Sequence, residues 1–365
     1  MGSVLGFEQR LNSFLASRKG QNSIAFLFLL FFFIFNAFSV QGKDRTYDEP
    51  RHYQYGMNIL NGNSARFDDS KMPISAWNAL PAKIVDKFHF PDGLLKAYLQ
   101  KLITARLMTT LFSMAVAFVV FHWSRQLYGF VPALFSIGLY IFDPNIIAHS
   151  QLVTTDVYAT GMILFSAYWL WKFANSRRWR DGIWLAVMLG MAQLAKYTAI
   201  SLYPLFALTL LVYDWPAIRT AFEISGWRAV GRVVSQYLKY AVVVIVISLV
   251  IINVGFLFSR TFTHIRDYQF RSDLFKSFQS KVTFIVPVPY PYLEGLDWII
   301  QREQTNTGFG RVYLLGETRF GQGFPGYYFV ASLLKVPIAT QIVLLVAFAV
   351  YSFDREGRKY FFCNE

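Results

Sequence analysis

Long apolar runs bounded by charged residues constrain the fold of this chain more than any other feature. Runs about as long as Ile103–Trp123 recur along most of its length. An α-helix of roughly 20 apolar residues crosses the hydrocarbon layer of a bilayer. The runs are continuous and do not alternate with a period of two, so membrane helices are expected rather than a β-barrel. The hydrophobic fraction of 55% and mean hydropathy of +0.35 also exceed those of an ordinary soluble domain.

The sequence therefore predicts an all-α polytopic membrane protein with about eight spans. The first apolar run follows Arg10, Arg18 and Lys19, as the core of a signal peptide would. It is long for such a core and has no Ala-x-Ala cleavage site, so we expect it to be retained. The predicted spans are Ile24–Val40, Ile103–Trp123, Phe130–Phe142, Val157–Phe173, Gly182–Ala195, Thr198–Tyr213, Ala241–Phe258 and Gly326–Tyr351.

Lysine and arginine in short loops indicate the orientation, because they collect on the cytoplasmic side. With the N-terminus inside, the turn from Asp143 to Asp156 lies outside and contains no Lys or Arg. Two long segments, 41–101 and 259–325, are then external loops of a single domain over residues 1–365. The first should carry interfacial amphipathic helices such as Ile74–Val85. The inside segments hold Arg125, Lys172, Arg177, Arg178, Arg180, Arg219, Arg228, Arg232, Lys239, Arg355, Arg358 and Lys359.

The formal net charge of +13 does not indicate a nucleic-acid partner. Basic cytoplasmic loops that contact anionic membrane lipids account for it, and no basic patch is interleaved with aromatic residues. The single cysteine, Cys363, excludes internal disulfides and thiolate metal clusters. No Asn-x-Ser/Thr site occurs, which favours a bacterial inner membrane over the secretory pathway.

Two acidic motifs lie at the mouths of predicted spans, and the orientation above puts both outside. The first is Tyr47-Asp48-Glu49-Pro50-Arg51-His52. Asp48 is the leading candidate for a catalytic base, because a carboxylate near the interface is less solvated than one in water. Glu49 could share or modulate that role. The alternative is that Asp48 is a solvated loop carboxylate.

The second motif runs from Asp143-Pro144-Asn145 through His149 to Thr154-Thr155-Asp156. Asp156 is the second catalytic candidate. The alternative is an ordinary helix start, since Thr caps helices and an acidic residue in the first turn suits the dipole. Asp143-Pro144-Asn145 can likewise be a plain turn.

Lysines and histidines near these motifs are candidates for substrate binding. Lys71 and Lys196 could stabilise a leaving phosphate. The alternative for Lys196 is snorkelling at a helix end. His52 and His149 could join a carboxylate in holding a divalent metal ion, but no tight His-x-x-x-His spacing supports a metal site. Otherwise they are simple hydrogen-bonding groups.

Together these segments resemble the GT-C glycosyltransferases, within them the protein O-mannosyltransferase and aminoarabinose-transferase branch, glycosyltransferase family 39-like. The resemblance is carried by the first acidic motif, Met72-Pro73-Ile74-Ser75-Ala76-Trp77, the second acidic motif, and Gly326–Pro337. It implies a membrane enzyme that transfers a sugar from a polyprenyl phosphate, usually with inversion, to a protein, lipid or glycan acceptor outside the cytoplasm. Members of the family carry further C-terminal spans, so the resemblance also implies that the C-terminal part of the family domain is missing.

The resemblance implies roles for three residues. Asp48 matches the first-loop carboxylate that activates or positions the acceptor, and Asp156 matches a second essential acidic position. Lys71 falls where aminoarabinose transferases place a lysine near the donor phosphate, although their Pro-Pro is Met72-Pro73 here.

Two other classes of function stay open. A secondary transporter or flippase for an amphipathic anion would carry carboxylates or broken helices near mid-membrane, and no internal repeat marks one. An inactive membrane scaffold is the other alternative. Nucleotide hydrolysis, Rossmann cofactors and serine hydrolysis have no support, because their glycine-rich and nucleophile-elbow motifs are absent from the sequence.

Overall fold

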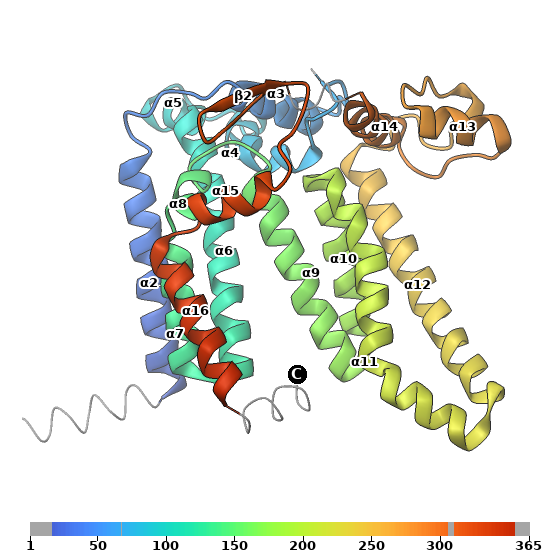
Figure 1. Ribbon diagram of the computed structural model, residues 1–365. Coiled ribbons are helices and arrows are strands. Elements are labelled where there is room, and N and C mark those ends of the chain that lie inside the picture. Colours follow the sequence, from blue (N-terminus) through green and yellow to red (C-terminus); the bar gives the residue numbers. More distant parts are fainter. Residues whose placement is uncertain (1–16, 67, 306–309, 355–365) are drawn as a thin grey trace, which may run out of the picture.

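The computed structural model describes residues 17–66, 68–305 and 310–354. Arg10, Arg355, Arg358, Lys359 and Cys363, named above, lie outside these ranges. Long helices run side by side through the body of the molecule, and short elements collect at one end of them (Figure 1). The long and apolar helices are α2 (Arg18–Ser39), α6 (Leu102–Tyr128), α7 (Phe130–Ile141), α9 (Asp156–Ser176), α10 (Trp179–Ala195), α11 (Leu202–Ser225), α12 (Trp227–Gly255) and α16 (Ile338–Phe353).

The short elements form a cap, which we call the polar cap, built mainly from the two long predicted loops. The predicted amphipathic stretch Ile74–Val85 is helical, as expected. A small antiparallel hairpin, β1–β2, was not predicted; it departs from a purely α-helical fold. The elements of the polar cap are α3 (Glu49–Leu60), η1 (Pro73–Ser75), α4 (Ala76–Lys87), α5 (Leu94–Leu99), α8 (Pro144–His149), η2 (Tyr197–Ser201), η3 (Ile265–Asp267), α13 (Asp273–Lys281), α14 (Tyr290–Gln304), β1 (Arg311–Leu314), β2 (Glu317–Phe320) and α15 (Tyr327–Lys335).

Each of the predicted spans coincides with helix in the structure. Among the described residues, four helical stretches are long and apolar enough to cross a membrane, and a fifth joins them if α15 and α16 count as one broken span. The multi-pass membrane fold is thus confirmed, whereas the count of about eight spans stays a prediction. The four stretches are Arg18–Ser39, Leu102–Tyr128, Tyr197–Ser225 and Val230–Gly255.

The last predicted span, Gly326–Tyr351, is wrong as a continuous helix. The chain bends by 106° between α15 and α16. Val336 has extended backbone angles and Pro337 precedes the first residue of α16. Proline has no N–H to donate and disfavours helical geometry in the residue before it, so the helix stops there.

Outward-facing apolar side chains are consistent with a lipid environment. Only 17% of the most apolar window of α2, α11 or α12 is buried within the protein, against 50% for α6. Phe38 of α2 and Val212 of α11 are 72% and 67% exposed. An apolar surface of this extent in water would be strongly unfavourable, whereas lipid chains solvate it at no such cost.

Small residues let the helices pack closely inside the bundle. A Cβ atom added to Gly190 of α10 would lie 2.8 Å from Ile251 Cβ of α12, and one on Gly161 of α9 would lie 2.5 Å from Val116 Cγ2 of α6. Helices in membranes gain much of their association from such close packing. These contacts hold α9 and α10, the helices that carry the second acidic motif and Lys196, against their neighbours.

Candidate active site

A buried ion pair joins the first acidic motif to the membrane helices. Arg106, near the start of α6, donates two hydrogen bonds to Glu49, Nε to Oε1 at 2.8 Å and Nη2 to Oε2 at 2.7 Å. The side chains of Arg106 and Glu49 are 2% and 0% exposed. Arg106 also donates to the backbone carbonyls of Lys43 and Asp44, at 3.0 and 2.8 Å. A guanidinium can serve four acceptors in this way because its donors are fixed in one plane.

Glu49 also ties the two acidic motifs together. Its oxygens accept the backbone N–H groups of Thr46, at 2.8 Å, and of Val153, at 3.0 Å. Burial acts to raise the pKa of Glu49, but hydrogen bonds from Arg106 and from these two N–H groups outweigh it and hold the pKa below its usual range. Glu49 is therefore ionised at neutral pH with both oxygens engaged. These contacts give it a structural task, and its catalytic role remains a prediction.

Asp48 faces the opposite way and forms a second ion pair. Lys71 Nζ lies 3.1 Å from Asp48 Oδ1 and 3.6 Å from Asp68 Oδ2. The Asp48 side chain is 54% exposed, whereas that of Lys71 is 3% exposed. Among the described residues, no hydrogen bond reaches Asp48 Oδ2. The lysine thus holds one oxygen of Asp48 and leaves the other open to solvent or to a substrate.

Asp68 was not predicted as part of this cluster. Partial burial acts to raise its pKa, but the hydroxyl of Ser70 and the charge of Lys71 keep the pKa below its ordinary value. Lys71 therefore retains an anionic partner independent of Asp48.

Asp156 forms a third ion pair, with Lys196 at the end of α10. Lys196 Nζ lies 3.2 Å from Asp156 Oδ1, and both side chains are 48% exposed. His149 Nδ1 is 3.9 Å from Asp156 Oδ2. Asp156 also occupies the first turn of α9, so the helix-start interpretation and the ion pair hold together. Asp143 accepts the N–H groups of Asn145 and Ile146 and caps α8, so Pro144 and Asn145 begin a short helix rather than a plain turn.

His52, the last residue of the first motif, is affected by charges of both motifs. It is 6% exposed, and its Nδ1 lies 3.3 Å from Ser75 Oγ. Burial and the charge of Lys71 lower the pKa of His52 to about 4, against opposing contributions from Asp48, Asp68 and Asp156. The imidazole therefore interacts electrostatically with carboxylates of both acidic motifs, which lie at the same end of the bundle.

Protonation of His52 is expected to destabilise the protein in acid. Its folded-state pKa lies below the ordinary value of 6.5, so the unfolded chain binds more protons between these values. Stability should fall as the pH drops from 6.5 towards 4, by about 2 kcal/mol between pH 7 and pH 5. Melting temperatures of wild type and His52→Asn at the two pH values test this. The melting temperature of His52→Asn should fall less from pH 7 to pH 5 than that of wild type. An equal fall in the two proteins would contradict the role of His52. His89→Asn, at an exposed position whose φ of 48° suits asparagine, is the control.

The candidate metal ligands do not converge. Among the described residues, no group of three or more His, Cys, Asp or Glu side chains could hold a metal ion. His52 contacts a serine hydroxyl, and His149 approaches a single carboxylate. A divalent metal ion therefore stays an open prediction.

The second long loop is held over the same end of the bundle by Arg66. This side chain is 6% exposed and donates to Tyr197 Oη at 2.6 Å, Pro291 O at 2.5 Å and Asp69 Oδ1 at 3.0 Å. Arg271 adds a bond to Asp69 Oδ2, also at 3.0 Å. Tyr197 directly follows Lys196, so this network fixes the backbone beside the third ion pair.

Gly295 allows α14, in the second long loop, to pack against Tyr197. A Cβ atom on Gly295 of α14 would overlap the hydroxyl of Tyr197.

Neither Arg66 nor Arg106 was predicted as a site residue. The signal for Arg106 was available, because a charged residue inside the predicted span Ile103–Trp123 calls for a buried partner. Arg66 carried no such signal, since it lies in a polar loop.

Taken together, the geometry describes a multi-pass helical membrane protein whose polar end carries two carboxylate–lysine pairs, each with a half-exposed carboxylate, beside the buried pair of Arg106 and Glu49. Residues 98–255 match the model of a family described as dolichyl-phosphate-mannose-protein mannosyltransferase. The match covers less than half of the chain, and over this segment it agrees with the resemblance found in the sequence. No curated protein and no solved structure matches the chain. Arg106, His149, Asp156 and Lys196 fall inside the matched segment, whereas Asp48, Glu49, His52 and Lys71 precede it.

Proposed function

We propose that this protein transfers a sugar from a polyprenyl-phosphate donor to a protein, lipid or glycan acceptor at the external face of a bacterial inner membrane. The observation that carries the proposal is the pairing of Asp48 with Lys71 and of Asp156 with Lys196 at one end of the bundle. The family match supports the donor class, since its description names a lipid-phosphate sugar. The bias of short-loop Lys and Arg to the opposite end supports the external location.

Asp48 is the proposed general base. Its free Oδ2 would accept the proton of an acceptor hydroxyl while that oxygen attacks the anomeric carbon of the donor. The bond between this carbon and the phosphate oxygen breaks, and polyprenyl phosphate leaves with the electron pair. General base catalysis of this kind contributes about 10²- to 10⁴-fold to the rate. Lys71 orients Asp48 through the contact to Oδ1, and Asp156 helps to place the acceptor or supports Asp48.

Lys196 is better placed than Lys71 to contact the departing phosphate. The Lys71 side chain is almost fully buried and is paired with two carboxylates, whereas Lys196 is half exposed and directly follows α10, a predicted membrane span. An ammonium at that boundary can meet the phosphate of a lipid whose chains lie in the membrane. The sequence had ranked Lys71 first for this role, and the geometry supports the reverse order.

Lys196→Gln should therefore lower kcat/KM for the donor by about 100-fold, because one fixed cation at the developing phosphate charge is lost. Initial rates at varied donor concentration measure it. Lys83→Gln is the matched control, since Lys83 is another lysine of the polar cap and contacts only Asn61 Oδ1 among the described residues. A rate for Lys196→Gln equal to that of the control would contradict the phosphate role.

Cleavage of the donor tests the proposed function as a whole. Purified protein in liposomes, given a polyprenyl-phosphate sugar labelled in the sugar together with candidate acceptors, should release free polyprenyl phosphate and label an acceptor in equal amounts. A transporter or flippase would move the donor across the bilayer uncut. Movement without cleavage would overturn the proposal.

A further inference from the structure

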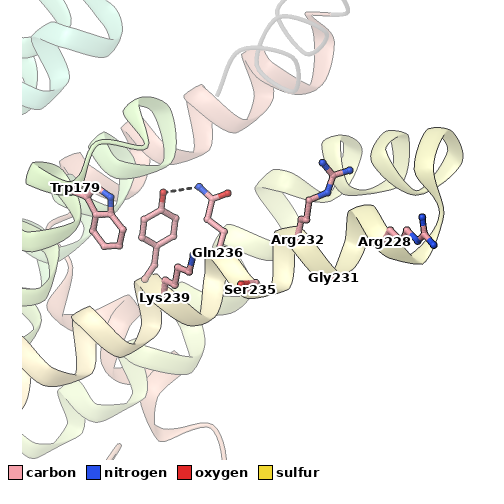
Figure 2. A pocket seen from close by; sticks show the side chains of 8 residues that line it. Trp179, Arg228, Gly231, Arg232, Ser235, Gln236 and Lys239 are labelled. Atoms are coloured by element: carbon pink, nitrogen blue, oxygen red, sulfur yellow. Dashed lines mark hydrogen bonds between the residues drawn. The ribbon is translucent and has the colours of Figure 1, made fainter.

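A basic hollow lies at the end of the bundle opposite the acidic motifs, between the starts of α10 and α12 (Figure 2). Its volume is about 600 Å³. Three cations line it, Arg228, Arg232 and Lys239, and no carboxylate does. The remaining lining residues are Trp179, Gly231, Ser235, Gln236 and Tyr240.

The three cations are presented together because of their spacing on α12. Residues three and four positions apart share one face of a helix, and Arg228, Arg232 and Lys239 follow such steps through Ser235. All three side chains are exposed. Among the described residues, no ion pair or hydrogen bond engages any of them. Arg228 and Arg232 lie one helical turn apart, so their like charges repel and an anion between them would be favoured.

An apolar hollow of about 640 Å³ adjoins the basic one. The two share Trp179, Gly231, Ser235 and Lys239. The rest of the apolar hollow is formed by Val234, Leu238, Val242 and Val243, further along α12 towards the middle of the predicted membrane span. The combined groove is therefore basic at its outer end and apolar along its length.

Aromatic packing gives this groove a firm wall. The Tyr240 ring lies 4.8 Å from the Phe173 ring and 4.8 Å from the Trp179 ring, centroid to centroid. Gln236 Nε2 donates to Tyr240 Oη at 2.9 Å, as the dashed line in Figure 2 shows. Tyr and Trp are favoured at the level of lipid headgroups, where one side of the ring is wet and the other apolar.

The groove is separate from the candidate active site. Trp179 begins α10, and the 17 residues of this helix end at Ala195, next to Lys196. A helix of that length spans roughly 25 Å. The groove and the acidic motifs therefore lie near opposite membrane surfaces, and the groove belongs to the surface that the basic short loops mark as cytoplasmic.

We propose that this groove binds an anionic phospholipid of the cytoplasmic leaflet. The phosphate lies between Arg228 and Arg232, Lys239 adds positive charge further along the groove, and an acyl chain lies along Val234, Leu238 and Val242. A free phosphate would use only the basic half, whereas the apolar half requires a lipid. The binding holds the start of α12 against α10 at the headgroup level. It is independent of the proposed glycosyl transfer.

Native mass spectrometry of the detergent-solubilised protein tests this by lipid titration. Phosphatidylglycerol should bind in one preferred site, tighter than phosphatidylcholine with the same chains, and inorganic phosphate should not displace it. The triple variant Arg228→Gln, Arg232→Gln, Lys239→Gln should weaken phosphatidylglycerol binding by on the order of 10- to 100-fold.

A second variant fills the groove without changing its charge. Gly231 lines both hollows, and a Cβ atom added to it would meet nothing within 4 Å. Gly231→Phe should therefore fold and lose the preferred site. The charge control is the triple variant Arg125→Gln, Lys172→Gln, Arg180→Gln, which removes the same amount of charge at the same end of the bundle. It should retain the preferred phosphatidylglycerol site. Equal losses in the two triple variants, or full binding by Gly231→Phe, would overturn the proposal.

Discussion

Asp48→Asn is expected to abolish glycosyl transfer, with a drop in kcat of about 10²- to 10⁴-fold, while the protein still inserts and folds. Asparagine has nearly the same shape but cannot take the proton of the acceptor hydroxyl. Folding should be preserved because the Asp48 side chain makes no capping hydrogen bond at α3. Lys71 also keeps Asp68 as a partner, so no buried cation is left unpaired.

Single-turnover rates of donor consumption measure this effect, and the melting temperature checks the fold. Asp92→Asn is the matched control, because Asp92 is a fully exposed carboxylate of the polar cap paired only with Lys96 among the described residues. It should leave the rate unchanged. Full activity of Asp48→Asn would exclude the base role.

Breaking the buried pair between Arg106 and Glu49 should have the largest effect on stability. Glu49→Gln or Arg106→Gln leaves its former partner charged and buried without an opposite charge, which costs about 3–5 kcal/mol. Each variant should also loosen the link between the two acidic motifs, because Glu49 accepts the N–H of Val153. Activity should therefore fall along with stability.

A double-mutant cycle on the free energy of unfolding isolates the pair. The double variant should lose less than the sum of the two single losses, by about 1–3 kcal/mol, because it leaves no lone buried charge. Arg219→Gln and Glu223→Gln form the control cycle, on an exposed pair whose coupling should stay below about 1 kcal/mol. Additive losses for Arg106 and Glu49 would show that the two charges are not coupled.

The predictable part of the fold followed from the apolar runs. Hydrophobicity determines which segments can be membrane helices, and each predicted span is helical in the structure. The bend before Pro337 was missed because the apolar run continues through it, although the proline itself predicts a break. The hairpin of β1 and β2 could not be predicted from hydropathy, because it packs no apolar face of its own.

The site was predictable residue by residue but not as a set of contacts. Asp48, Asp156 and the two lysines were identified from their places beside apolar runs. Their pairing depends on the folding of the first loop over α6 and α9. Arg106 fixes that fold, and its place inside a predicted span indicates a buried partner but not which residue the partner is. Long-range partners of this kind, 57 residues apart in the case of Glu49 and Arg106, leave no periodic trace in the sequence.

The configuration of the product at the anomeric carbon tests the account most directly. If Asp48 removes a proton while the acceptor attacks in line, each transfer is a single displacement and the configuration inverts. NMR of the glycosylated product, compared with the donor of known configuration, measures this in one experiment. The account predicts complete inversion. Retention would require a covalent sugar–enzyme intermediate on a carboxylate and would contradict the role assigned to Asp48.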